Sequence, residues 1–133
     1  MPVAGESVVS IVDGPLGPHV PGPAEEGAGA AILFEGIVRG QEAGRPIEAL
    51  DYEVYEPMAS RELGLLIGEL LGGEGILAIR AWHSRGRVPV GAVSFRLLVA
   101  SVHRKEGLRA MDAFIDRMKR DVPIWKRAVV AGA

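Results

Sequence analysis

Five basic side chains have the types and positions to bind an anion. They are Arg39, His103, Arg104, Lys119 and Lys126, and each is expected at the end of a strand or helix, where functional residues commonly occur. Arginine offers a planar fork of donors that matches a phosphate, and histidine can donate from either ring nitrogen. The lysines are candidates for a nucleophile or a general base. The set therefore predicts a site for a phosphate and a polar heterocycle.

The same residues also have structural explanations that need no ligand. Lys119 and Arg120 would complement the dipole at the C-terminal end of a helix. His103, taken alone, is more readily a hydrogen-bonded structural histidine. His19 and His83 have no sequence neighbours that favour a role, and three scattered histidines argue against a metal site.

The elements that must position these residues begin with strands. Residues 7–12 are expected to form a short strand, and residues 13–30, with four prolines and five glycines, a loop. Residues 30–38 and 47–55 are rich in strand formers, and residues 39–46 have the glycine and proline content of a turn. The first half of the chain thus predicts three strands.

A first amphipathic helix is expected after these strands. Pro57 suits its first turn, apolar residues recur at helical spacing from Ala59 to Leu70, and Gly72 and Gly73 end it. Further strands are expected at residues 76–82 and 92–102, joined by a link at residues 84–91.

A second amphipathic helix is marked by four apolar residues at spacings of three, four and three: Leu108, Met111, Ile115 and Met118. It must end near Val122, because Pro123 disfavours helical geometry in the residue before it, so Lys119 falls in the last turn. Residues 124–130 are expected to form a final strand. The order β-β-β-α-β-β-α-β predicts the α+β fold class.

The amino-acid composition excludes several classes of protein and of site. At 133 residues, 48% of them apolar, the chain suits one globular domain spanning residues 1–133. It has neither the roughly 18 to 20 apolar residues of a membrane span nor a signal-peptide pattern, so a cytoplasmic protein without membrane contact is expected. With no cysteine, it has no thiolate nucleophile and no cysteine zinc site.

Charge is divided unevenly along the chain. Residues 103–127 hold eight Lys or Arg against four Asp or Glu, a net charge of +4, whereas the remainder carries −6. An anionic small ligand would be drawn to the basic part. Nucleic acid is the weaker candidate, because the whole chain carries −2 and only 5% of its residues are aromatic.

From about Gly29 to Arg127 the chain resembles the MoaE family, the catalytic large subunits of molybdopterin synthases. The matching blocks are GAAILFEGIVRG at 29–40, LDYEVYEPMA at 50–59, HSRGRVPVG at 83–91, SVHRKEGLRAMDAFIDRMK at 101–119 and VPIWKR at 122–127. Any one block would be weak evidence. A Pro-Ile-Trp-Lys run after an Ile-Asp-x-x-Lys helix, with His-Arg ahead of it, is a specific combination.

The resemblance implies an α/β-hammerhead-like core with a mixed or antiparallel sheet, a homodimer within a heterotetramer, and no cofactor. The partner would be a small ubiquitin-like sulfur carrier whose C-terminal Gly-Gly carries a thiocarboxylate. The enzyme would be a sulfurtransferase that converts cyclic pyranopterin monophosphate into the dithiolene of molybdopterin, in molybdenum cofactor biosynthesis. Such a reaction needs no cysteine on this chain.

The resemblance also assigns roles to individual residues. The family's active-site lysines fall on Lys119 and Lys126, and its substrate-binding positions on Phe34, Arg39, His103 and Arg104. Lys119 is expected to be the principal catalytic group, near the thiocarboxylate carbonyl and the pterin, and Lys126 to assist in proton transfer and charge stabilisation.

The chain departs from the family at several positions: Ser84 in place of Arg, Ala92 in place of an acidic residue, Gly107-Leu108 in place of an Ala-Phe type pair, and Ala128 in place of Glu. Relatives usually continue past the position of Ala133 into a tail that gives a basic residue to the neighbouring subunit's site, so that contribution is expected to be absent. The rival hypothesis is a non-catalytic homologue that binds a ubiquitin-like partner or an anionic ligand.

Overall fold

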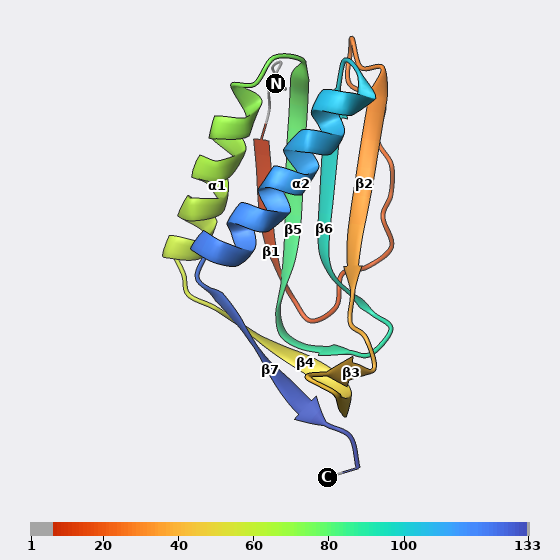
Figure 1. Ribbon diagram of the computed structural model, residues 1–133, viewed down its shortest axis with the longest axis vertical. Coiled ribbons are helices and arrows are strands. Elements are labelled where there is room, and N and C mark those ends of the chain that lie inside the picture. Colours follow the sequence, from red (N-terminus) through yellow and green to blue (C-terminus); the bar gives the residue numbers. More distant parts are fainter. Residues whose placement is uncertain (1–6, 133) are drawn as a thin grey trace.

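One long strand, β5 (Ile76–Pro89), organises the sheet. The computed structural model describes residues 7–132. The first half of β5 pairs antiparallel with β6 (Val93–Ser101) and parallel with β1 (Ser7–Asp13). The outer side of β6 pairs with β2 (Ala30–Ile37) (Figure 1). This half of the sheet therefore has β1 and β2 at its two edges.

The second half of β5 pairs with a different strand. Residues 86–89 pair with β4 (Arg45–Val54), which also pairs with β7 (Ile124–Val130) and with the two-residue strand β3 (Gln41–Glu42). Gly86 has a φ of +86° at the point where β5 leaves β1 for β4, a conformation that glycine adopts without strain.

Two sequence-based expectations need correction here. The link expected at residues 84–91 is wrong for most of its length, because β5 continues to Pro89 by gaining β4 as a new partner. The turn expected at residues 39–46 holds strand β3 and the start of β4, which form a hairpin.

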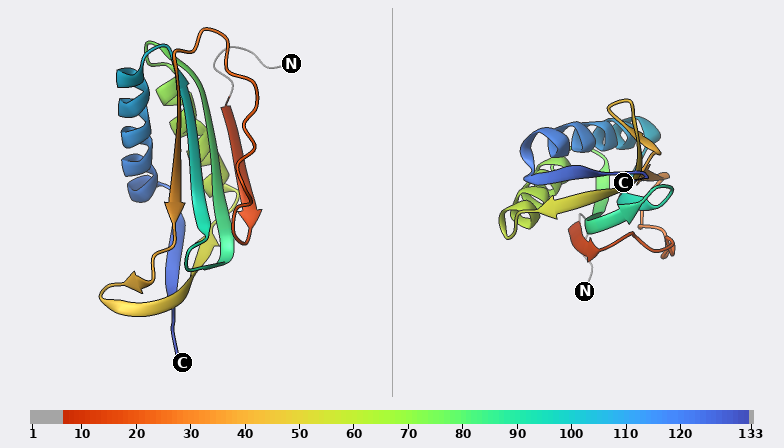
Figure 2. Two further views of the ribbon diagram at one scale, coloured as in Figure 1. Left: turned by 90° about the vertical axis from the view of Figure 1, so that its right-hand side faces the viewer. Right: turned by 90° about the horizontal axis from the view of Figure 1, so that it is seen from below.

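Two helices cover one face of the sheet (Figure 2). They are α1 (Met58–Leu71) and α2 (Arg104–Asp121). In α2 the fully buried Phe114 stacks on Phe95 of β6, with ring centroids 6.2 Å apart. Burying an aromatic side chain of this size is worth about 1.5–3 kcal/mol, so this contact fixes the helix on the sheet.

The apolar stripe expected along α2 is wrong at its first residue. Leu108 is 51% exposed, whereas its neighbour Gly107 is buried. The residues of α2 that face the core are Gly107, Ala110, Met111, Phe114 and Met118. These residues recur at the predicted helical period, but the buried face of α2 is rotated slightly from the expected one.

Residues 14–29 contain no helix or strand, as their prolines predicted, and cross the face of the sheet opposite the helices (Figure 2). Leu16 is buried there. Arg96, whose side chain is 7% exposed, donates to the carbonyl of Gly17 (2.6 Å) and to the carboxylate of Glu35 on β2 (2.7 Å). This buried arginine therefore holds the loop and the edge strand together.

The predicted α+β class, with a mixed sheet and two main helices, is confirmed. The expected element order is also confirmed, with β3 as the one addition. Among residues 7–132 no helix is both long and apolar enough to cross a membrane.

Candidate functional site

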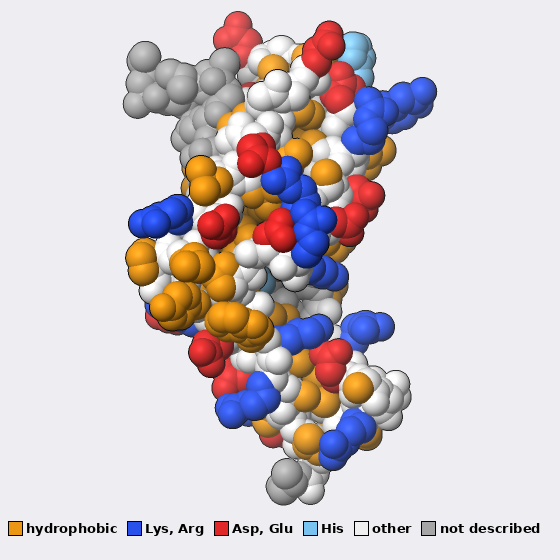
Figure 3. Space-filling model, turned by 60° about the vertical axis from the view of Figure 1, so that its left-hand side comes forward, with side chains coloured by type: hydrophobic (Ala, Val, Ile, Leu, Met, Phe, Trp, Pro, Cys, Tyr) orange, Lys and Arg blue, Asp and Glu red, His pale blue; other side chains and the backbone are white. Residues whose placement is uncertain are grey.

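A pocket of about 570 Å³ opens where the two halves of the sheet meet the end of α2. Its lining residues come from the end of β2, the β3 hairpin, β4, β5, β6, α2 and β7. Figure 3 shows this side of the molecule hollowed about halfway down, with Lys and Arg side chains on the rim.

Four of the six predicted site residues line this pocket: Phe34, Arg39, Lys119 and Lys126. Lys119 comes from the last turn of α2, and Lys126 from β7, where it pairs with Tyr52 of β4. A tight connection through Val122 and Pro123 separates the two lysines, so they reach one pocket from consecutive elements. Arg39, which is far from both lysines in the sequence, is the third cation that lines the pocket.

The backbone beside Arg39 is firmly fixed. Val38 is buried, its N–H donates to the carbonyl of Ala92 (3.0 Å), and its carbonyl accepts from Gly91 (2.8 Å). Val38 also packs in a small second core with Ile47, Leu50 and Val88. The guanidinium of Arg39 therefore extends from a rigid base at the rim of the pocket.

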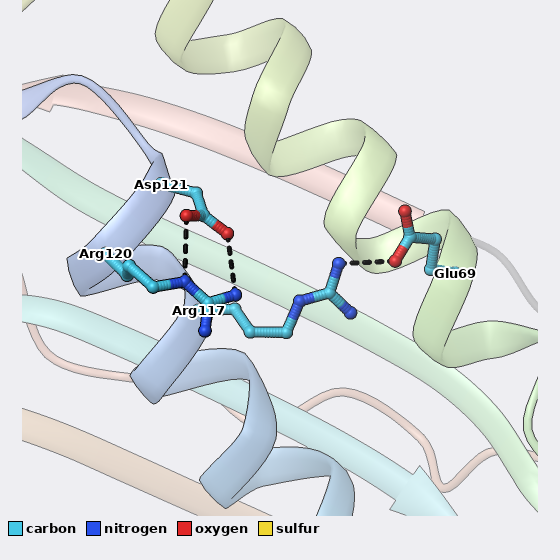
Figure 4. A network of polar contacts seen from close by, with 4 residues as sticks. All are labelled: Glu69, Arg117, Arg120 and Asp121. Carbon is cyan, nitrogen blue, oxygen red and sulfur yellow. Dashed lines mark hydrogen bonds and ion pairs between the residues drawn. The ribbon is translucent and has the colours of Figure 1, made fainter.

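The other two cations near the end of α2 that carries Lys119 are paired with carboxylates (Figure 4). Arg117 donates to Glu69 of α1, which ties the two helices together, and Arg120 makes two hydrogen bonds to Asp121 within α2 (2.9 and 3.0 Å). These pairs are largely exposed, so each adds little stability. Of the cations near this end of α2, Lys119 is the one that lines the pocket.

His103 and Arg104 do not line the pocket of their own chain. They stand at the opposite end of α2, where His103 Nδ1 lies 3.4 Å from Glu106. The fifteen-residue separation between Arg104 and Lys119 corresponds to roughly 22 Å along a helix. One chain therefore cannot bring both ends of α2 to the same small molecule.

The sequence patterns missed His83, which forms part of the pocket wall and is only 6% exposed. Its Nδ1–H donates to the carbonyl of Ser84 (2.8 Å), and its ring packs edge-on against Tyr52, with centroids 5.1 Å apart. Burial lowers the pKa of His83 below its ordinary 6.5, although the hydrogen bond to Ser84 opposes this. The imidazole is therefore neutral at pH 7, with Nε2 as a potential acceptor.

A signal for His83 was present in the sequence. Ile79, Ala81 and His83 alternate on the buried face of β5, and a polar residue that continues an apolar alternation usually has a reason to be buried. The strand expected at residues 76–82 ends one residue before His83, whereas β5 continues to Pro89.

The lip of the pocket also carries exposed apolar side chains. Ile37 and Trp125 are 57% and 56% exposed, and Phe34, on the edge strand β2, is 38% exposed. Inside, a neutral imidazole and the Tyr52 hydroxyl, which is hydrogen-bonded to Ser94 (3.0 Å), stand beside the cations. This combination suits a flat polar molecule that carries an anionic group. The described residues contain no cluster of three His, Cys, Asp or Glu that could hold a metal.

Comparisons with known proteins agree with this geometry. The family model described as MoaE protein matches residues 18–121. A molybdopterin synthase catalytic subunit from Dictyostelium discoideum is 39% identical over 105 residues, which cover 77% of this chain and 66% of that protein. The chain spans about half to two thirds of the length of such relatives, with 52% for an Arabidopsis thaliana counterpart.

Solved structures extend the likeness to the fold. The molybdopterin synthase structure from Staphylococcus aureus superposes with a TM-score of 0.79 at 30% identity, covering 93% of this chain and 92% of that one. A complex of subunits 1 and 2 of the molybdopterin-converting factor from Helicobacter pylori has a TM-score of 0.71, covering 93% and 90% of the two chains, and at 23% identity it supports the fold alone.

Proposed function

Since the chain belongs to the MoaE family, we propose that it is the catalytic subunit of a molybdopterin synthase. It would transfer sulfur from a thiocarboxylated ubiquitin-like carrier to cyclic pyranopterin monophosphate, forming the dithiolene of molybdopterin. The observation that carries this proposal is the convergence of Arg39, Lys119 and Lys126 on one pocket with Phe34 at its lip. These are four of the six residues that the family resemblance singles out.

The chemistry defines what the lysines must do. For sulfur to stay on the pterin, the carbon–sulfur bond of the carrier's thiocarboxylate must break, and its carbonyl carbon must gain an oxygen from water. In this proposal the Lys119 ammonium lies near that carbonyl and stabilises the charge that develops on its oxygen. Lys126 supplies or accepts a proton as the bond breaks, and Arg39 holds the phosphate through its guanidinium fork.

His103 and Arg104 enter this proposal only through a second copy of the chain. Both are exposed, and both stand one helix length from Lys119. If they bind substrate, they bind the molecule held in the pocket of a partner protomer. This fits the homodimer within a heterotetramer that the family resemblance implies.

The exposed apolar residues at the pocket lip support the proposed carrier. A Gly-Gly tail has no side chains, so it needs little room in the pocket, while the exposed Ile37 and Trp125 offer apolar surface to the body of a small protein. We also propose a cytoplasmic location, as expected from the sequence analysis, and the pocket gives no reason to invoke nucleic acid.

A reconstitution tests the proposal directly. Purified protein is mixed with thiocarboxylated carrier and cyclic pyranopterin monophosphate, and molybdopterin is measured by fluorescence after oxidation. Product that depends on both the protein and the thiocarboxylate supports the synthase. Binding of the carrier without product would instead favour a non-catalytic binding module, and would direct attention to Ser84, Ala92 and Ala128.

A further inference from the structure

One carboxylate stands among the cations of the pocket. Glu42 on β3 lies with Oε2 3.3 Å from Nζ of Lys126, and the two side chains are 30% and 55% exposed. Among the described residues that line the pocket, Glu42 is the single acidic one. The ion pair therefore joins a proposed active-site lysine to a residue that the family resemblance did not mark.

The β3 hairpin places Glu42 over the pocket. Glu42 pairs with Arg45 across the two turn residues Ala43 and Gly44, which have φ values of +51° and +78°. Two residues at positive φ form the tight turn that matches the twist of paired strands. The base of the hairpin is closed by a hydrogen bond from the N–H of Ile47 to the carbonyl of Gly40 (3.1 Å). Glu42 is thus fixed by backbone geometry.

The two lysines differ in their partners. Lys126 is paired with Glu42, whereas Lys119 and Arg39 make no ion pair with any residue in the described range 7–132. An ammonium held by a carboxylate has a defined position but must give up that contact, or share it, when an anion arrives. A carboxylate beside an incoming phosphate also repels it.

We propose that Glu42 is a positioning residue for Lys126 and the internal counter-ion with which an anionic ligand of the pocket competes. Before the ligand binds, Glu42 holds the Lys126 side chain across the pocket. When a phosphate or thiocarboxylate enters, it takes over the ammonium from Glu42. The part that concerns turnover rests on the proposed synthase function, whereas competition with an anion does not.

Inorganic phosphate is the probe that tests the competition. The Glu42→Gln variant is expected to bind phosphate about two- to fivefold more tightly than the wild type. The free energy of one exposed ion pair corresponds to a change in affinity of about that size. Glu48→Gln is the matched control. It also removes one carboxylate from an exposed pair, with Arg87 at 3.2 Å, but lies outside the pocket, so its affinity is expected to equal that of the wild type.

Carbon-13 labelled lysine gives a readout of position, because the chain has only three lysines: Lys105, Lys119 and Lys126. Without phosphate, Glu42→Gln is expected to shift the Lys126 side-chain signal and leave Lys105 unchanged. In the wild type, phosphate is also expected to move the Lys126 signal, because the ammonium exchanges Glu42 for phosphate. An unchanged Lys126 signal in Glu42→Gln, or a gain in affinity equal to that of Glu48→Gln, would overturn the proposal.

The synthase assay separates the two parts of the proposal. With cyclic pyranopterin monophosphate as substrate, Glu42→Gln is expected to lower both KM and kcat, since the substrate meets less competition while Lys126 loses its support. A lower kcat with unchanged KM would contradict competition. If the wild type makes no molybdopterin, the proposed function fails, but the phosphate and lysine measurements still decide the role of Glu42.

Discussion

Lys119 and Lys126 reach the same pocket from consecutive elements, one from the last turn of α2 and one from β7. The connection between them is fixed at both ends. The N–H of Val122 donates to the carbonyl of Met118 (3.1 Å), and the carbonyl of Pro123 accepts from Tyr55 (3.1 Å). The main chain therefore brings both lysines to one site, and Pro123 ends the helix between them.

The buried Arg96 is expected to contribute strongly to stability. Arg96→Met should lower the free energy of unfolding by about 3 kcal/mol, because it leaves Glu35 and the Gly17 carbonyl without their partner. Arg87→Met removes one side of an exposed pair and should cost less than about 1 kcal/mol. Urea unfolding of both variants measures the difference. Equal losses would show that Arg96 does not anchor the loop.

His83 gives the fold a pH dependence with a definite sign. Because burial lowers its pKa below 6.5 in the folded chain, the unfolded chain takes up a proton first as the pH falls. The free energy of unfolding should therefore decrease below about pH 6.5, by up to about 1.4 kcal/mol per pH unit. Urea unfolding between pH 7.5 and 5.5 should give a flatter profile for His83→Gln than for the wild type. A wild-type slope in His83→Gln would contradict the burial of a neutral imidazole.

Gly107 and Gly64 are expected to respond in opposite directions to alanine. A Cβ at Gly107 would clash with Ser101 Oγ and lie 2.9 Å from Ile32, whereas one at Gly64 meets nothing within 4 Å. Gly107→Ala should destabilise the protein by about 1–3 kcal/mol through overpacking. Gly64→Ala should stabilise it by about 0.5–1 kcal/mol through helix propensity. Thermal unfolding of the pair tests this, and stabilisation by both would refute the close packing of α2 on β6.

Local patterns in the sequence predicted most of the fold. The prolines at 13–30, the period of the two helices and Pro123 each act on their own neighbourhood, so their consequences can be inferred residue by residue. The extension of β5 past Trp82 could not be inferred in this way. It depends on β4, a partner distant in sequence, and no local pattern encodes which strand will pair there.

The residues of the candidate site were also predicted only in part. Phe34, Arg39, Lys119 and Lys126 were identified through the family resemblance, and the fold brings them to one pocket. His83 and Glu42 were not identified. Glu42 lies on the β3 hairpin and Lys126 lies on β7, far along the chain. Only the folded structure therefore reveals the contact between them.

The most direct test of the pocket as the site of sulfur transfer compares two variants, Lys119→Met and Arg120→Met. The measured quantity is the rate of molybdopterin formation in a single turnover. The two residues are neighbours on the last turn of α2, and each variant removes one positive charge, but Lys119 lines the pocket and Arg120 does not. Loss of a group that stabilises developing charge or transfers a proton should slow Lys119→Met by about 10²-fold or more. Arg120→Met should keep the wild-type rate. Full turnover by Lys119→Met, or equal losses in both variants, would contradict the assignment of this pocket as the catalytic site.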